Sequence, residues 1–202
     1  MNNWLKLVVA AGIVGYGVVA WADEPAKKDS TEKVETKLVV GQPAPEFKIK
    51  DSGGKVIDLA ELTAKGPVLV RLTCGCSGCD KELAYFQELH EAYKAKGLTS
   101  LAIFKEPDAK VEEYVKTKKL NMLYAVDTKG ESWNTFQTKT MPTNILIDKG
   151  GKIVQIAAGC DPSGMLAKKL SEKVADTVKS EAIDVKAAVD AKNKKDEKSP
   201  GK

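Results

Sequence analysis

Three of the four cysteines in this chain lie within residues 74–79, in the order Cys-Gly-Cys-Ser-Gly-Cys. An apolar run, 68–72, precedes them, and a helical pattern begins near Ser77. A Cys-X-X-Cys pair between a strand and a helix is typical of redox sites, because the helix N-terminus favours the thiolate of the first cysteine. The second cysteine can then attack a mixed disulfide formed on the first. The spacing therefore predicts Cys76 as the nucleophile and Cys79 as the resolving cysteine.

The remaining cysteines, Cys74 and Cys160, leave three interpretations open. They can be buried thiols that behave as small hydrophobic side chains. They can also form an auxiliary disulfide with each other, which would relay electrons or lock the site. In the third interpretation all four cysteines together bind zinc or Cu(I), because both ions accept thiolate ligands. The ligands would then be Cys74, Cys76, Cys79 and Cys160.

The N-terminal residues predict an export signal. Lys6 is the only charged side chain before the apolar run 7–20, and Ala20-Trp21-Ala22 then places small residues where a signal peptidase recognises them. We therefore expect residues 1–22 to be a signal peptide cleaved after Ala22, followed by a disordered polar linker, 23–38. The alternative is an uncleaved membrane anchor, although the apolar run is shorter than the roughly 20 residues of a spanning helix. Both alternatives place the protein in an oxidising compartment, the periplasm of a bacterium.

The charge balance argues against a nucleic-acid-binding function. The formal net charge is +4, and residues 186–202 alone hold six lysines against three acidic residues, so the rest of the chain is nearly neutral. Arg71 is the only arginine, whereas a nucleic-acid surface concentrates basic side chains. The Lys-rich end, 180–202, is expected to be a flexible tail.

Alternating strand and helix patterns fill residues 39–179 and predict one domain. Two short strands on either side of Asp51-Ser52-Gly53-Gly54 predict a hairpin. The buried strand after Pro67 is followed by a helix that ends before Gly97. Further strands are predicted at 98–104, 122–126, 143–147 and 152–158, and further helices at 111–118, at 131–136 and around Leu166 to Val178. This order predicts an α/β fold with a mixed central sheet, helices on both faces and an N-terminal β-hairpin.

Four segments carry a resemblance to a known family. They are Val40 to Phe47 (VGQPAPEF), the Cys76-Ser77-Gly78-Cys79 motif, Met141-Pro142-Thr143, and Ile145 to Ile153 (ILIDKGGKI). In this order the chain resembles thioredoxin-fold proteins of the redoxin group (AhpC/TSA-like superfamily), and among them the exported TlpA/ResA-like thiol-disulfide oxidoreductases. The resemblance implies a thioredoxin-like fold over about residues 39–179.

The resemblance also implies roles for residues outside the cysteine motif. Met141-Pro142 resembles the cis-proline loop, in which the backbone of Met141 would pair with a substrate chain and Pro142 would pack against the dithiol. Glu82 resembles the acidic residue beside the dithiol of the ResA-like branch, where it would accept the proton of Cys79. The alternative for Glu82 is a solvated helix residue. One departure is Gly75, which stands where the family has an aromatic side chain.

Arg71 is unusual because it lies in an otherwise apolar strand, where an unpaired charge is costly. We expect it to pair with an acidic side chain or to reach the edge of the sheet. A third option is that it lowers the pKa of the nucleophilic thiol.

The sequence and the resemblance together predict an exported thiol-disulfide oxidoreductase that reduces protein disulfides through its own redox-active disulfide, without another cofactor. Its partners would be protein substrates and a separate electron donor, most simply a membrane protein, and membrane contact requires an uncleaved N-terminal segment. The alternative function is a zinc- or copper-binding metallochaperone. A thiol peroxidase with antioxidant activity is a further alternative, because Thr73 stands three residues before Cys76, although the proline that precedes such a threonine is missing.

Overall fold

A computed structural model describes residues 38–197 of the 202-residue chain. The predicted signal peptide, 1–22, and almost all of the predicted linker, 23–38, lie outside the described residues. Within the described range, no helix combines the length and the apolar character needed to cross a membrane.

The central sheet has five strands in the order β5-β4-β3-β6-β7. The strands are β3 (Val68–Thr73), β4 (Thr99–Phe104), β5 (Leu123–Val126), β6 (Thr143–Ile147) and β7 (Ile153–Ala158). Strand β4 runs parallel to β3 and β5, whereas β6 is antiparallel to both β3 and β7. The mixed central sheet predicted from the sequence is therefore confirmed.

The predicted N-terminal hairpin is also present. Strands β1 (Lys48–Lys50) and β2 (Val56–Asp58) pair in antiparallel register around the Gly-rich turn. Helix α1 (Leu59–Lys65), which the sequence pattern did not predict, follows β2 directly. The carboxylate of Asp58 caps this helix by accepting a hydrogen bond from the backbone N–H of Ala60, at 2.9 Å.

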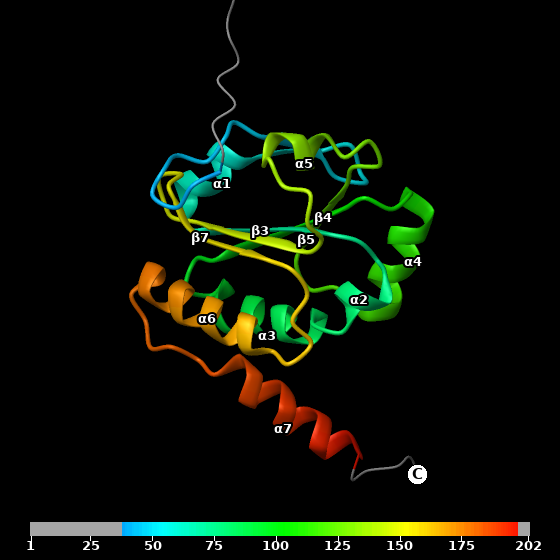
Figure 1. Ribbon diagram of the computed structural model, residues 1–202, viewed down its shortest axis with the longest axis vertical. Coiled ribbons are helices and arrows are strands. Elements are labelled where there is room, and N and C mark those ends of the chain that lie inside the picture. Colours follow the sequence, from blue (N-terminus) through cyan, green and yellow to red (C-terminus); the bar gives the residue numbers. More distant parts are fainter. Residues whose placement is uncertain (1–37, 198–202) are drawn as a thin grey trace, which may run out of the picture. The chain divides into compact units, whose positions relative to one another are not determined.

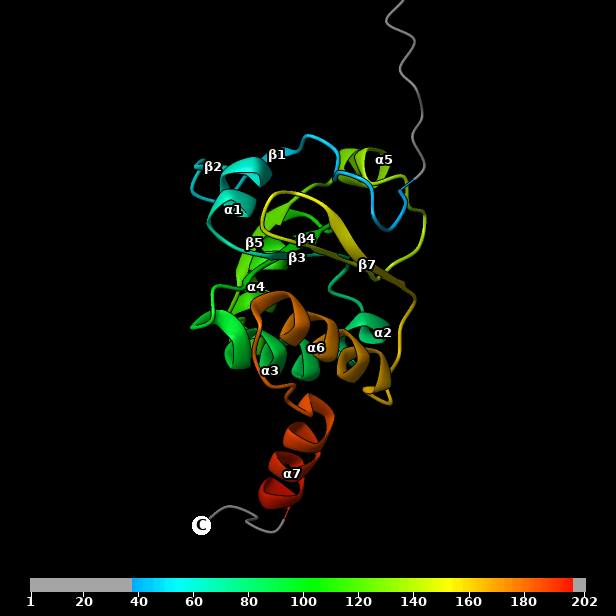
Figure 2. The same cartoon turned by 90° about the vertical axis from the view of Figure 1, so that its left-hand side faces the viewer.

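Helices cover both faces of the sheet (Figures 1 and 2). One face carries α1 and α5 (Glu131–Thr135). The other carries α2 (Ser77–Asp80), α3 (Leu83–Lys94), α4 (Asp108–Lys118) and α6 (Met165–Val178).

Alternation along β3 divides its side chains between the two layers of the core, because successive residues of a strand point to opposite faces. Val68, Val70 and Leu72 belong to the apolar cluster on the side of α1 and α5. Leu69 belongs to the cluster formed with α3 and α6. Arg71 therefore points to the same side as Leu69, toward the helices that follow the cysteine motif.

The C-terminal end differs from the prediction of a flexible tail at 180–202. Helix α7 (Val185–Glu197) lies against α3 and α6 (Figure 2), and Val185 and Val189 are buried in the core they form. The hydroxyl of Tyr93 reinforces this packing by accepting a hydrogen bond from the backbone N–H of Ile183, at 2.9 Å. For residues 185–197 the prediction was wrong, because two valines four residues apart form too short an apolar stripe to stand out among lysines.

Candidate active site

The cysteine motif begins where β3 ends and crosses into α2. Cys74 follows the last residue of β3, and Cys76 is the N-cap residue of α2, with extended backbone angles. The backbone N–H groups of a first helical turn lack intrahelical partners, and such an environment favours a thiolate. Cys79 lies inside α2 and is only 3% exposed, whereas Cys74 is 9% exposed. Cys76 is therefore the most exposed residue of the three.

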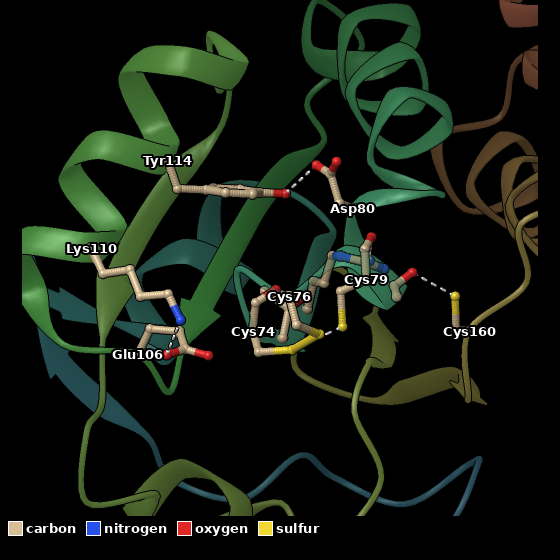
Figure 3. Close-up of a disulfide and its surroundings, with 11 residues drawn as sticks. Cys74, Cys76, Cys79, Asp80, Glu106, Lys110, Tyr114 and Cys160 are labelled. Carbon is tan, nitrogen blue, oxygen red and sulfur yellow. Dashed lines mark hydrogen bonds and ion pairs between the residues drawn. A yellow bond between two sulfur atoms is a disulfide. The ribbon is translucent and has the colours of Figure 1, made fainter.

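The three sulfur atoms form one cluster (Figure 3). A disulfide joins Cys74 to Cys76, and the free thiol of Cys79 has its Sγ 3.4 Å from the Sγ of Cys74. All three Sγ atoms lie within 4.8 Å of one another. The sequence predicted that Cys76 and Cys79 would form the disulfide. The structure instead has the disulfide between Cys74 and Cys76. Cys-X-X-Cys spacing shows which residues share a helical turn, but it does not show how the loop before the helix folds back on it.

Cys160 does not join this cluster. Its thiol donates a hydrogen bond to the backbone carbonyl of Gly78, at 2.8 Å, on the side of α2 away from Cys74 (Figure 3). The auxiliary disulfide between Cys74 and Cys160, one of the three interpretations left open by the sequence, is therefore absent from this structure, and so is a cluster of four sulfurs. Burial raises the pKa of Cys160, and the negative charge of Glu82 raises it further. Cys160 is thus held as a protonated thiol that can donate to Gly78.

Arg71 and Glu82 form a buried ion pair beneath the motif. Arg71 Nη1 lies 2.7 Å from Glu82 Oε1, and the two side chains are 3% and 1% exposed. The guanidinium also lies 4.2 Å from the centre of the Phe86 ring, and its Nη2 donates to the carbonyl of Cys79 at 3.3 Å. The predicted acidic partner of Arg71 is therefore Glu82, and the interpretation of Glu82 as a solvated residue is wrong.

This pair connects four segments that are distant in sequence. Arg71 Nη1 also donates to Asn144 Oδ1 on β6, at 2.9 Å. The second carboxylate oxygen of Glu82 accepts from the backbone N–H of Asp161, in the loop between β7 and α6, at 2.8 Å. The network therefore ties the end of α2 to β3, β6 and the loop that holds Cys160.

Met141-Pro142 lies alongside the cysteine motif, as the resemblance implies. The peptide bond between the two residues is cis. Strand β6 pairs with β3 so that Thr143, its first residue, stands opposite Leu72, near the end of β3. Met141-Pro142 therefore lies at the same end of the sheet as the cysteine motif that follows β3. Met141 is exposed, whereas Pro142 is buried.

Tyr114 is a neighbour of the motif that sequence analysis missed. A Cβ atom at Gly75 would lie 3.4 Å from the Tyr114 ring, so a ring from α4 covers the glycine that replaces the family's aromatic residue. The Tyr114 hydroxyl donates to Asp80 on α2 at 3.0 Å (Figure 3). Lys118 pairs with the same carboxylate. Burial and the bond to Asp80 raise the pKa of Tyr114 above its ordinary range, which keeps the phenol a donor. No local signal links residues almost forty positions apart.

Two further side chains, those of Thr73 and of His90, take no part in the sulfur cluster. The hydroxyl of Thr73 donates to the carbonyl of Cys74, at 3.3 Å, so it is not directed to Cys76 as a peroxidatic threonine would be. His90 hydrogen-bonds Ser100 through Nδ1, at 3.1 Å, on the body of α3.

The sheet order and the cysteine motif define a thioredoxin-like protein. Residues 40–156 match the model of the AhpC/TSA family, and the chain belongs to this family. Among solved structures, a Chlorobium tepidum protein proposed to be a thiol:disulfide interchange protein DsbE shares the fold with a TM-score of 0.64 and 24% identity, covering 70% of this chain and 99% of its own. Peroxidoxin BcpB from Mycobacterium tuberculosis shares it with a TM-score of 0.58 and 20% identity, covering 69% and 96%.

Curated relatives narrow the class further. The chain is 37% identical over 126 residues to thiol-disulfide oxidoreductase ResA of Bacillus thuringiensis subsp. konkukian (strain 97-27), covering 62% of this chain and 73% of the relative. It is 28% identical over 163 residues to ResA of Bacillus subtilis (strain 168), covering 80% and 84%. The protein is a thiol-disulfide oxidoreductase with a thioredoxin-like fold.

Proposed function

We propose that this protein is exported and reduces disulfide bonds of other exported proteins, with Cys76 as the attacking thiolate. The main support is the exposure of Cys76 at the N-cap of α2, with two further sulfurs directly behind it. The Cys76 thiolate attacks one sulfur of a substrate disulfide, breaks that bond and releases one substrate thiolate. Cys79 then attacks the mixed disulfide and releases the second thiolate. Two electrons pass to the substrate, and the enzyme keeps a disulfide.

Three other residues support this reaction in the proposal. Glu82 accepts the proton of Cys79, and its burial beside α2 is consistent with that role. The exposed backbone at Met141 pairs with the substrate chain, while the buried Pro142 packs against the motif. Arg71 holds Glu82 in place through the ion pair.

The cellular part of the proposal rests on the N-terminal sequence and the resemblance. The apolar run 7–20 and the small residues before Asp23 support export and cleavage after Ala22. In an oxidising compartment the enzyme disulfide persists until a reductant opens it. A separate donor, most simply a membrane protein, must therefore return two electrons after each turnover.

The proposal is tested by mixing the pre-reduced full chain with a disulfide-bonded protein such as insulin and counting the thiols that appear on the substrate. We expect Cys76→Ser to abolish the transfer, because no other exposed sulfur of the motif remains. Cys160→Ser is the matched control, since a serine hydroxyl can still donate to the Gly78 carbonyl. Transfer by Cys76→Ser at the rate of the control would contradict the proposal.

A second candidate function is metal binding by the reduced cluster. The supporting observation is that the Sγ atoms of Cys74, Cys76 and Cys79 all lie within 4.8 Å of one another. Thiolates of this kind select zinc and Cu(I). Titrating the reduced chain with each ion tests it: tight binding should be lost in Cys74→Ser and kept in Cys160→Ser. Equal, weak binding by the two variants and the wild type would remove this candidate.

A further inference from the structure

We infer that Cys74 is a third redox-active cysteine, which can resolve the mixed disulfide on Cys76 and pass the resulting disulfide on to Cys79. This inference rests on the proposed function and adds a residue to it. In the simplest Cys-X-X-Cys mechanism only Cys79 attacks the mixed disulfide on Cys76, and Cys74 takes no part in the reaction. The arrangement of the sulfurs favours a site with three members.

The first step follows from the disulfide between Cys74 and Cys76. Because these two sulfurs bond, Cys74 reaches the atom that carries the substrate in the mixed disulfide. A Cys74 thiolate can therefore attack that atom, form the bond to Cys76 and release the substrate thiolate. Cys74 precedes Cys76 by two residues and extends from the end of β3, so it approaches from the strand, whereas Cys79 approaches from the helix.

The second step follows from the contact between Cys79 and Cys74. The two Sγ atoms are 3.4 Å apart, and Cys79 is a free thiol. The Cys79 thiolate attacks Cys74 Sγ, the bond between Cys74 and Cys79 forms, and the bond between Cys74 and Cys76 breaks. Cys76 leaves as a thiolate, and the proton lost by Cys79 passes to Glu82, its acceptor in the proposed function. The exchange consumes no oxidant or reductant, because one disulfide replaces another.

The exchange changes which sulfur is accessible. Cys74 and Cys79 are 9% and 3% exposed, so a disulfide between them is largely buried. Cys76 regains a free thiolate at the N-cap of α2 while the protein remains oxidised by two electrons. The oxidised enzyme is therefore a mixture in which part of the molecules still present a reactive Cys76.

The inference also means that Cys74 and Cys79 can replace each other as the resolving cysteine. Either Cys74 or Cys79 alone should complete the reaction, and only their joint loss should trap the substrate on Cys76. Cys160 offers a matched control, because it lies outside the sulfur cluster and bonds to the Gly78 carbonyl instead.

Disulfide mapping of the full chain tests the exchange directly. Trypsin cleaves after Arg71 and after Lys81, so one peptide, 72–81, holds all three sulfurs. The metal-free protein is oxidised with one equivalent of a small disulfide, its free thiols are alkylated, and the disulfide is then reduced and alkylated with a heavier reagent. Fragment masses of the peptide show which cysteine was free.

We expect the light label on Cys79 in one population and on Cys76 in another. A light label found only on Cys74 would mean that the single disulfide joins Cys76 to Cys79, and the inference would be overturned. If the wild type takes up no disulfide at all, the proposed function itself fails, so the two failures are distinguishable.

Substrate turnover by cysteine variants provides the independent test. The rate in Cys79→Ser or in Cys74→Ser should fall by less than about tenfold, because a neighbouring thiol still attacks within the molecule. The double variant should lose at least about 100-fold and accumulate the mixed disulfide, because both intramolecular routes are gone. Cys160→Ser should match the wild type. If Cys79→Ser accumulates as much mixed disulfide as the double variant, Cys74 does not resolve.

Discussion

At the scale of single residues, the guanidinium of Arg71 is the only charged side chain in β3, and it lies on the face of the sheet that α3 and α6 cover. Its partner, Glu82, stands at the start of α3. We expect Arg71→Leu to lower the free energy of unfolding by about 3–5 kcal/mol, because Glu82 would remain as a buried, unpaired charge. Denaturant unfolding of the reduced chain measures this loss.

The matched control is the double variant Arg71→Leu/Glu82→Gln. It leaves no buried charge, and the glutamine oxygen can still accept from the N–H of Asp161. Stability should therefore recover in part relative to Arg71→Leu. If the single variant unfolded like the wild type, the ion pair would have no structural role.

Glu82 also supports a prediction about the reaction. In a Cys74→Ser background, where only Cys79 can resolve, Glu82→Gln should slow release of the substrate by roughly tenfold or more, because general base assistance is lost. Formation of the mixed disulfide on Cys76 should keep its rate. Acid-quenched time courses separate the two steps by mass. Equal slowing of both steps would show that Glu82 acts on the structure of the site rather than on the proton of Cys79.

At the scale of elements, Asp161 joins α6 to the site. Its carboxylate accepts from Ser163 and from the backbone N–H of Leu166 in the first turn of α6, while its own N–H donates to Glu82. The hydrogen bond from the Ser163 hydroxyl lowers the pKa of Asp161, and burial opposes this effect only in part.

A lowered pKa in the folded state makes the contribution of Asp161 pH-dependent. The stabilisation is fully present above the unfolded pKa of about 3.9 and disappears as the pH falls through the lower, folded value. The stability difference between the wild type and Asp161→Asn should therefore be constant near neutrality and shrink in acid. Asp176→Asn, an exposed change on the same helix, is the control for unfolding measured across this range. If the stability difference between the wild type and Asp161→Asn grew in acid, the pKa of Asp161 would not be lowered in the folded state.

Helix α7 supports a second prediction at this scale. Val185 is fully buried against the layer formed by α3 and α6. Val185→Ala should lower the free energy of unfolding by about 2 kcal/mol, from roughly 0.8 kcal/mol per buried methylene and the cavity left behind. Ala187→Ser, exposed on the same helix, should have almost no effect. Equal stability of the two variants in denaturant would mean that α7 does not contribute to the core.

At the scale of the whole molecule, the proposed export would determine the redox conditions that the cluster meets. We predict that a bacterial host removes residues 1–22, because Ala20 and Ala22 provide the small side chains that cleavage requires. The intact mass of the exported protein should then correspond to a chain that begins at Asp23. A periplasmic product with the full mass would instead indicate the uncleaved membrane anchor.

The sequence by itself determined the order of the strands, the order of the helices other than α1 and α7, and the position of the reactive cysteines. Hydrophobic spacing and turn residues act over a few positions, so β3 follows Pro67 and the hairpin surrounds the Gly-rich turn as predicted. The Cys-X-X-Cys motif places Cys76 at the start of a helix for the same local reason. Met141-Pro142 was recognisable as a family segment, and its cis bond agrees with that resemblance.

Tertiary structure alone decided which groups meet. Cys74 contacts Cys79, while Cys160 bonds to Gly78 on the other side of α2. Tertiary structure also decided that Glu82 pairs with Arg71, that the Tyr114 ring covers the motif, and that α7 packs on α3 and α6. These contacts join segments that are separate in sequence, and they form because β3 buries its charge and the helices bury their apolar faces. Local spacing predicts the secondary structure and the possible chemistry of a residue. Tertiary packing determines which other residue it contacts.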